Sequence, residues 1–178
     1  MIAATTALLV IDAQTGLLER AHRRDETIAA INDLISRARA AGSPVVYVQH
    51  DGGDEDRAWV GTDAWQIHPA ILPRRDELLI RKPASDSFYG TPLRSELERL
   101  GIGRLVVAGL RTEMCIDTTC RVATSSGFDV ELAADAHTTR DGDHLSAAQI
   151  VAHHNETLDD FGNDEHVVVV RPAAEIAF

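Results

Sequence analysis

The stretch Leu105-Val106-Val107-Ala108-Gly109-Leu110-Arg111-Thr112-Glu113-Met114-Cys115 joins an apolar run to a glycine and then to a cysteine. Its first four residues are apolar without interruption, as in strands of a parallel sheet that is covered on both faces. The cysteine then falls where a helix is expected to begin, and the dipole at a helix start stabilises a thiolate. The stretch therefore predicts a buried strand that leads into a nucleophile, although buried helical cysteines also occur as inert core residues.

Six short β-rich runs occur along the chain, several of them apolar on consecutive residues, and helical patterns lie between most of them. The six expected strands are Ala7 to Ile11, Val45 to Gln49, Leu78 to Arg81, Leu105 to Ala108, Asp129 to Ala133 and Val167 to Val170. The three clearest helical patterns are Glu26 to Ala41, Thr91 to Leu100 and Leu145 to Leu158. This alternation predicts an α/β fold, namely a doubly wound three-layer α/β/α sandwich around a mostly parallel six-stranded sheet. The 178 residues fit one domain over residues 1–178.

Composition excludes several classes of function. A formal net charge of −11 argues against binding to nucleic acid or to an anionic membrane surface. No apolar run approaches the ~18 residues of a membrane helix, and the first one lacks the basic flank of a signal peptide. Cys115 and Cys120 are five residues apart and fall on different helix faces, so we expect no disulfide and assign Cys120 to the core. These features favour a reducing compartment and a cytoplasmic protein.

Three polar residues with complementary chemistry follow expected strands. Asp12 follows the first, Lys82 the third, and Cys115 comes after the fourth through a short turn. Because ligands of open α/β sheets bind at the carboxyl ends of the strands, these side chains should share one rim. The carboxylate could take the thiol proton, the ammonium could favour the thiolate, and the sulfur could attack a carbonyl.

The chain resembles the isochorismatase-like cysteine hydrolase family, which includes nicotinamidases and N-carbamoylsarcosine amidases. The matching elements, in family order, are Leu8-Leu9-Val10-Ile11-Asp12-Ala13-Gln14, Arg81-Lys82 with Ser87-Phe88-Tyr89-Gly90-Thr91, the segment from Val107 to Cys115, and Ala134-Asp135-Ala136-His137-Thr138-Thr139. The resemblance implies a catalytic triad of Cys115, Asp12 and Lys82. It also implies a cis peptide bond at Leu110–Arg111 and an oxyanion hole formed by the backbone N–H groups of Arg111 and Cys115.

The sequence departs from the nicotinamidases at their metal site. Those enzymes carry an Asp-x-His pair after the second strand, whereas this chain has Gln49-His50-Asp51, in the wrong order. We therefore expect no metal and no other cofactor, which disfavours nicotinamide as the substrate. Whether His50 and His68 bind substrate, a metal or neither stays open.

Five residues near the predicted rim are candidate substrate contacts, with simpler roles open for most of them. Gln14 could instead make a loop hydrogen bond, Phe88 and Tyr89 could simply pack, and Trp65 could contact a neighbouring subunit; Thr112 is the fifth. Asp135 and His137 favour a structural corner over a second catalytic dyad, and His153-His154-Asn155 is interpreted as surface or interface.

Together these features predict a cysteine-dependent amidohydrolase that cleaves a C–N bond of a small non-peptide amide, ureide or lactam through a thioester. Two alternatives remain: a vinyl ether hydrolase of the isochorismatase type, and a non-catalytic binding domain of the same fold. The expected partners are a small-molecule substrate and further copies of the chain, in a homodimer or a higher homo-oligomer.

Overall fold

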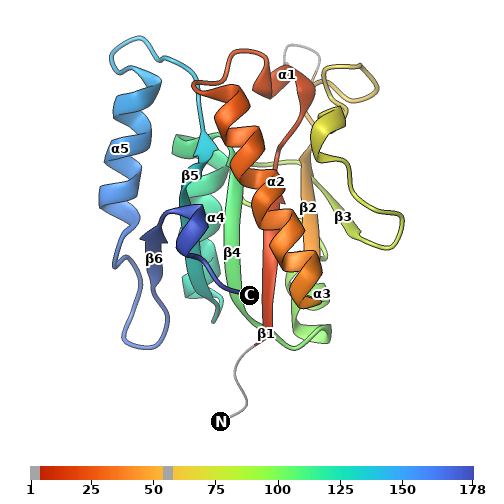
Figure 1. Ribbon diagram of the computed structural model, residues 1–178, viewed down its shortest axis with the longest axis vertical. Coiled ribbons are helices and arrows are strands. Elements are labelled where there is room, and N and C mark those ends of the chain that lie inside the picture. The colour runs from red at the N-terminus through yellow and green to blue at the C-terminus, as the bar shows by residue number, and fades with distance from the viewer. Residues whose placement is uncertain (1–4, 54–57) are drawn as a thin grey trace.

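The computed structural model describes residues 5–53 and 58–178 of the chain. Within them, six strands form one sheet: β1 (Thr5–Ile11), β2 (Val45–His50), β3 (Leu78–Lys82), β4 (Ile102–Leu110), β5 (Asp129–Thr138) and β6 (Val168–Arg171). The strand order is β3-β2-β1-β4-β5-β6 and every pairing is parallel, which confirms the predicted α/β sheet (Figure 1). The winding direction reverses between β1 and β4, and ligands of such folds bind at the strand ends near that reversal.

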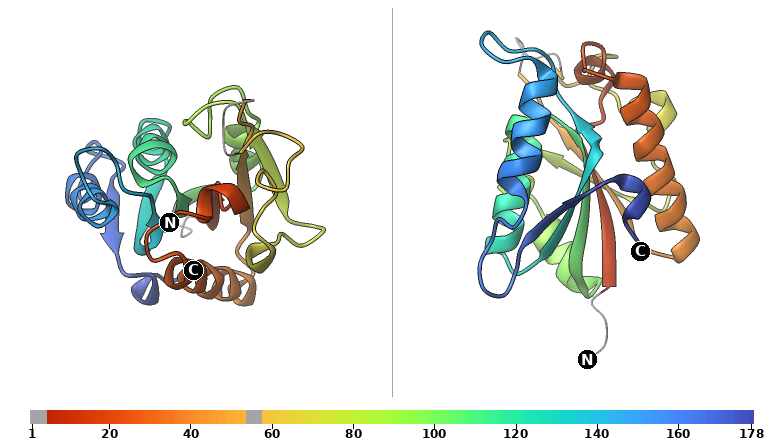
Figure 2. Two further views of the ribbon diagram at one scale, coloured as in Figure 1. Left: turned by 90° about the horizontal axis from the view of Figure 1, so that it is seen from above. Right: turned by 60° about the vertical axis from the view of Figure 1, so that its left-hand side comes forward.

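Helices cover both faces of the sheet. They are α1 (Thr15–Leu18), α2 (Arg24–Ala41), α3 (Leu93–Arg99), α4 (Asp117–Ser125) and α5 (Ala147–Leu158), with shorter turns η1 (Pro69–Ile71), η2 (Thr112–Ile116) and η3 (Ala173–Glu175). Seen from above, α2 lies on one side of the sheet, and α4 and α5 lie on the other (Figure 2). None of the helices in the described residues is long and apolar enough to cross a membrane.

Each face of the sheet has its own apolar core, because successive residues of a strand point to opposite faces. In β1, Leu9 and Ile11 pack in the core under α3, α4 and α5, whereas Leu8 and Val10 pack in the core under α2. This two-sided burial explains why β1 is an unbroken apolar run from Ala7 to Ile11.

The strand limits differ most from prediction at β5, which continues to Thr138 instead of ending at Ala133. The pairing of β4 with β5 shifts register between Val107 and Gly109, after which Gly109 pairs with His137. The extended pairing places Asp135 and His137 inside the strand, so the predicted strand end at Ala133 was wrong.

Two predicted helix starts are two residues early. The helix predicted from Thr91 begins at Leu93, and the one predicted from Leu145 begins at Ala147. At the second start, the Ser146 side chain accepts a hydrogen bond from the Gln149 backbone N–H in a capping box. The cap therefore sets this boundary, one residue inside the apolar pattern.

The close approach of β4 to β1 at their carboxyl ends requires a glycine at position 109. Its φ is +126°, and a Cβ added to it would lie 1.9 Å from the carbonyl oxygen of Ile11. A side chain at this position would push apart the two strand ends that lead to Asp12 and to the cysteine turn.

Candidate active site

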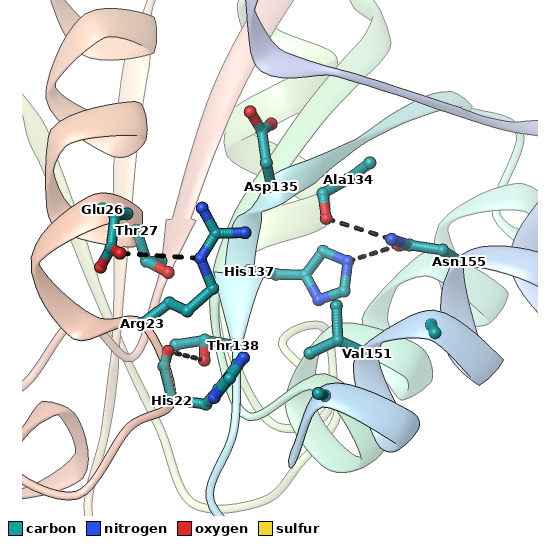
Figure 3. Close-up of a pocket in the computed structure, with 12 residues that line it drawn as sticks. His22, Arg23, Glu26, Thr27, Ala134, Asp135, His137, Thr138, Val151 and Asn155 are labelled. Atoms are coloured by element: carbon teal, nitrogen blue, oxygen red, sulfur yellow. Dashed lines mark hydrogen bonds and ion pairs between the residues drawn. The ribbon is translucent and has the colours of Figure 1, made fainter. Parts of the chain in front are cut away.

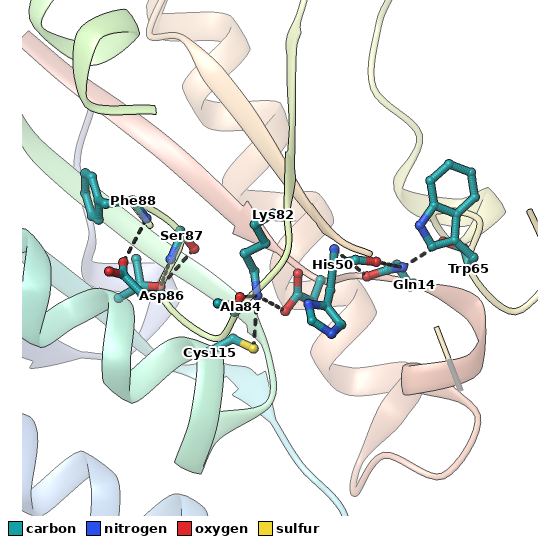
Figure 4. A network of polar contacts seen from close by, with 11 residues as sticks. Gln14, His50, Trp65, Lys82, Ala84, Asp86, Ser87, Phe88 and Cys115 are labelled. Carbon is teal, nitrogen blue, oxygen red and sulfur yellow. Dashed lines mark hydrogen bonds and ion pairs between the residues drawn. The ribbon is translucent and has the colours of Figure 1, made fainter. Parts of the chain in front are cut away.

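Three strands deliver the three predicted catalytic side chains to one point at the carboxyl edge of the sheet. Figure 4 shows the contact between Lys82 and Cys115. Asp12 directly follows β1, and Cys115 lies in η2, the turn after β4. Lys82 is the last residue of β3, and β2 separates it from β1, so the long lysine side chain spans the end of β2.

The Lys82 ammonium is the centre of this cluster. Its Nζ lies 2.9 Å from Oδ2 of Asp12, 3.1 Å from Sγ of Cys115 and 2.8 Å from the carbonyl oxygen of Ala84. The ammonium thus donates hydrogen bonds to the Ala84 oxygen and the Cys115 sulfur and forms an ion pair with Asp12. Lys82 and Asp12 are 0% exposed and Cys115 is 9% exposed, so the three groups interact with little solvent screening.

Burial dominates the protonation of the cluster. Burial and the nearby Asp12 carboxylate raise the pKa of Cys115 to about 12, despite the opposing effect of Lys82. Burial also raises the pKa of Asp12, although Lys82 and His50 act in the other direction. Burial disfavours the ammonium, but Asp12 and Cys115 outweigh it and raise the pKa of Lys82. A pKa raised in this way favours the neutral thiol and runs against the expectation of a thiolate stabilised by the helix start.

The turn that carries the cysteine begins with an unusual peptide bond. The Leu110–Arg111 bond is cis, as the resemblance implies. Arg111 directly precedes η2, and its guanidinium pairs with the carboxylate of Glu113. The backbone N–H groups of Arg111 and Cys115 thus belong to one short turn at the end of β4.

This arrangement of sheet and turn has known counterparts. Residues 6–160 match the model of the isochorismatase domain. The chain belongs to the isochorismatase family. A streptothricin hydrolase of Streptomyces noursei is 38% identical over 138 residues, which cover 76% of this chain and 55% of the relative. A ureidoacrylate amidohydrolase, RutB of Methylobacterium radiotolerans, is 29% identical over 157 residues, covering 66% of this chain and 61% of the relative.

A crystal structure of an isochorismatase from Pseudomonas putida KT2440 superposes with a TM-score of 0.88 at 30% identity. The match covers 96% of this chain and 89% of that structure. The chain spans about half the length of the two streptothricin hydrolases that it matches, 55% and 50%.

Gln14 has a different role in this isochorismatase-family chain from the predicted substrate contact. Its amide Nε2 donates to the carbonyl oxygens of His50 and Trp65, at 3.0 and 2.8 Å, and its Oε1 accepts from the His50 backbone N–H. Both amide N–H groups are thereby used, and the side chain is fully buried. Gln14 anchors the segment after β2 to the end of β1, which is the loop role left open from the sequence.

Trp65 lies in the same anchored segment and faces away from the thiol (Figure 4). Its indole N–H donates to Asp51, and the Arg81 guanidinium lies 4.9 Å from the centre of its ring. Arg81 also pairs with Asp51 at 2.8 Å, so the three side chains form one cluster beside β3. The predicted wall of the substrate pocket is instead a clamp that holds this loop.

The two predicted aromatic contacts after β3 also lie elsewhere. Phe88 stacks on Phe128 with ring centres 6.0 Å apart and packs against the core. Tyr89 is 66% exposed. Phe88 is thus a packing residue, the simpler of the two roles considered, and Tyr89 belongs to the surface.

Thr112 and Asn155 show what the sequence missed. Thr112 is fully buried, and its hydroxyl lies 2.8 Å from Nδ1 of His137, so the predicted substrate contact is instead tied to β5. Nε2 of His137 lies 2.7 Å from Oδ1 of Asn155, which is half-buried and was interpreted as a surface or interface residue. Asp135 accepts from the backbone N–H of Ala173. The sequence gives no direct sign of these hydrogen bonds, because it shows only that Thr112, His137 and Asn155 are polar.

The two histidines left open have separate surroundings. His50 ends β2, and its electrostatic effect opposes the rise that burial causes in the pKa of Asp12. His68 accepts a hydrogen bond from the Ala70 backbone N–H at the start of η1. Within residues 5–53 and 58–178, no group of three or more His, Cys, Asp or Glu side chains is placed to hold a metal ion.

Proposed function

We propose that the protein is a cysteine-dependent amidohydrolase that cleaves a C–N bond of a small non-peptide amide, ureide or lactam. The observation that carries the proposal is the buried ammonium of Lys82, which contacts both the Asp12 carboxylate and the Cys115 sulfur. Nucleophile, base and cation within hydrogen-bonding distance are the components of covalent acyl transfer. The names of two relatives, a ureidoacrylate amidohydrolase and a streptothricin hydrolase, support hydrolytic chemistry of this kind.

In the proposed reaction, Asp12 accepts the thiol proton while Sγ of Cys115 forms a bond to the carbonyl carbon. The carbonyl π electrons move to the oxygen, where the N–H groups of Arg111 and Cys115 stabilise the negative charge. The C–N bond then breaks, and the proton held by Asp12 passes to the departing amine. Lys82 holds the carboxylate and the sulfur in contact throughout these steps.

The second half of the reaction restores the thiol. Asp12 takes a proton from a water molecule, and the resulting hydroxide attacks the thioester carbonyl. The C–S bond breaks, the acid leaves, and the proton on Asp12 returns to sulfur. Each proton transfer thus uses the same carboxylate, which fits a base that burial has made easier to protonate.

The test is a panel of small amides, ureides and lactams, assayed for release of ammonia or amine. Cys115→Ala should abolish turnover while the far-UV circular dichroism spectrum stays unchanged. Cys120→Ala is the matched control, because Cys120 is fully buried in the core and should be dispensable. Mass spectrometry of acid-quenched protein should show the acyl group on Cys115 alone. Turnover that persists in Cys115→Ala would overturn the proposal and favour acid catalysis by Asp12.

A further inference from the structure

A buried chain of hydrogen bonds links α5 to the cysteine turn through His137. Asn155 Nδ2 lies 3.1 Å from the carbonyl oxygen of Ala134, Asn155 Oδ1 lies 2.7 Å from His137 Nε2, and His137 Nδ1 lies 2.8 Å from Thr112 Oγ1. Figure 3 shows the first two of these bonds from Ala134 to His137.

Which atom donates each of these hydrogen bonds follows from the Ala134 carbonyl oxygen at one end of the series. A carbonyl oxygen only accepts, so the Ala134 oxygen requires the NH₂ group of Asn155, and the Asn155 oxygen must face His137. That oxygen also only accepts, so Nε2 of His137 carries the proton. In the neutral ring Nδ1 is then the acceptor, and it receives the hydroxyl proton of Thr112.

Thr112 is the first residue of the turn that carries Cys115. It follows Arg111, begins η2, and precedes the nucleophile Cys115 by three residues. Its side chain is fully buried, and so is nearly all of His137, which is 2% exposed. The hydroxyl bond therefore ties the turn that holds the sulfur and the proposed oxyanion N–H groups to the rigid strand β5.

We propose that His137, kept in its Nε2–H form by Asn155, is a positioning residue that orients the cysteine turn through the hydroxyl of Thr112. Its kinetic consequence rests on the proposed function, but the hydrogen-bonded form and its link to the turn do not. The role does not involve contact with the substrate.

The positioning requires a neutral ring, because a protonated Nδ1 could no longer accept from Thr112. Burial lowers the pKa of His137 to about 4; the hydrogen bond with Asn155 acts in the opposite direction, His154 reinforces the effect of burial, and Asp135 opposes it. His137 also borders a cavity of about 270 Å³ whose charged or titratable neighbours on the side of α2 are His22, Arg23 and Glu26 (Figure 3). The ring accordingly stays neutral from pH 5 to pH 8.

Nitrogen NMR of the ¹⁵N-labelled protein tests the form of the ring without any substrate. Wild type should show Nε2 protonated and Nδ1 unprotonated throughout pH 5–8. Asn155→Asp places a carboxylate beside Nε2, which favours the cation and should bring the titration of His137 into this range. The backbone amide signals of Thr112 and Cys115 should then shift with the same midpoint.

The matched control for this substitution is Asn163→Asp, in an exposed turn where the asparagine oxygen accepts from backbone N–H groups. It should leave both the ring and the turn signals unchanged. A wild-type ring protonated on Nδ1 would overturn the proposal. So would a titration of His137 in Asn155→Asp that leaves the signals of Thr112 and Cys115 in place.

The kinetic test compares two substitutions of His137. Asparagine supplies an oxygen where Nδ1 stands, whereas leucine of similar reach supplies a methyl group. Leucine should lower kcat about 10- to 100-fold with KM changed less than about threefold, because misplaced catalytic groups cost rate more than affinity. The kcat of His137→Asn should be at least about fivefold higher than that of His137→Leu. Substrates are those among acetamide, N-carbamoylglycine and 2-pyrrolidone that wild type hydrolyses.

The two proposals can fail separately. If Cys115→Ala retains turnover, the proposed chemistry fails while the NMR result still decides the positioning role. If asparagine and leucine at position 137 are equally impaired and equally destabilised in urea, His137 is only a packing residue and the positioning proposal fails.

Discussion

Replacing Lys82 by methionine removes the charge that compensates the buried carboxylate of Asp12. The two charged atoms are 2.9 Å apart and both side chains are 0% exposed. At an effective dielectric constant of about 20, charges at this separation attract by about 6 kcal/mol, part of which offsets their desolvation. Removing one partner of a buried pair costs about 3–5 kcal/mol, and we expect a loss of that size in the free energy of unfolding at pH 8.

The loss should shrink as the pH falls. Burial already raises the pKa of Asp12 above its ordinary value, and without Lys82 it rises further. The folded protein then binds a proton that the unfolded chain has released, so stability is greatest at low pH and falls as the pH rises through this window. Each pH unit inside the window changes the stability by about 1.4 kcal/mol. The raised pKa of Lys82 in wild type affects stability only in the alkaline range.

Urea unfolding of a double-mutant cycle measures the interaction. Asp12→Asn combined with Lys82→Met removes both charges. The double variant should therefore lose at least about 2 kcal/mol less free energy of unfolding than the two single variants lose in sum. The control cycle is Arg94→Met with Glu98→Gln, a pair 3.2 Å apart whose side chains are 54% and 61% exposed. It should give a coupling below about 0.5 kcal/mol. A buried coupling as small as the exposed one, or a loss that grows toward low pH, would refute the reasoning.

Three further outcomes follow from single contacts. Gly109→Ala should lower the free energy of unfolding by at least about 3 kcal/mol. Gly53→Ala, whose Cβ meets no atom of residues 5–53 and 58–178 within 4 Å, should change it by less than about 1 kcal/mol; equal effects would contradict the close approach at Gly109. The rate of Cys115 alkylation by iodoacetamide should keep rising above pH 9, because the thiol pKa is about 12; a plateau near pH 8.5 would contradict it. Ser146→Ala should cost about 1 kcal/mol through loss of the α5 cap, and an unchanged Tm would argue against the capping box.

The sheet could be predicted because burial on both faces leaves a direct mark on sequence. All six expected strands are present, and unbroken apolar runs form the centres of β1, β2 and β4. Strand and helix ends could not be predicted as well, because they depend on partners distant in sequence. The last residues of β5 are a strand only because β4 continues beside them past a register shift.

The convergence of Asp12, Lys82 and Cys115 could also be anticipated, because parallel strands deliver their carboxyl ends to one edge. The contacts of the residues that surround the cluster could not be anticipated from the sequence. A glutamine or threonine near a site can bond to substrate or to the protein, and the choice depends on which partner lies within about 3 Å. Gln14 forms hydrogen bonds to the segment that begins at the end of β2, and Thr112 forms one with His137. Neither partner is adjacent in sequence.

The protonation of the thiol shows why position in a helix was a poor guide to reactivity. A helix end stabilises a charge by up to about 2 kcal/mol in a partly buried setting. Burial and the Asp12 carboxylate nevertheless raise the pKa of Cys115 to about 12, so together they outweigh such a dipole and the opposing effect of Lys82. Losing the proton to solvent would leave two anions beside one ammonium, whereas passing it to Asp12 keeps the total charge of the cluster constant. The proposed reaction therefore requires transfer within the cluster, and Asp12→Asn should abolish acylation of Cys115 even at a pH at which an ordinary thiol is ionised.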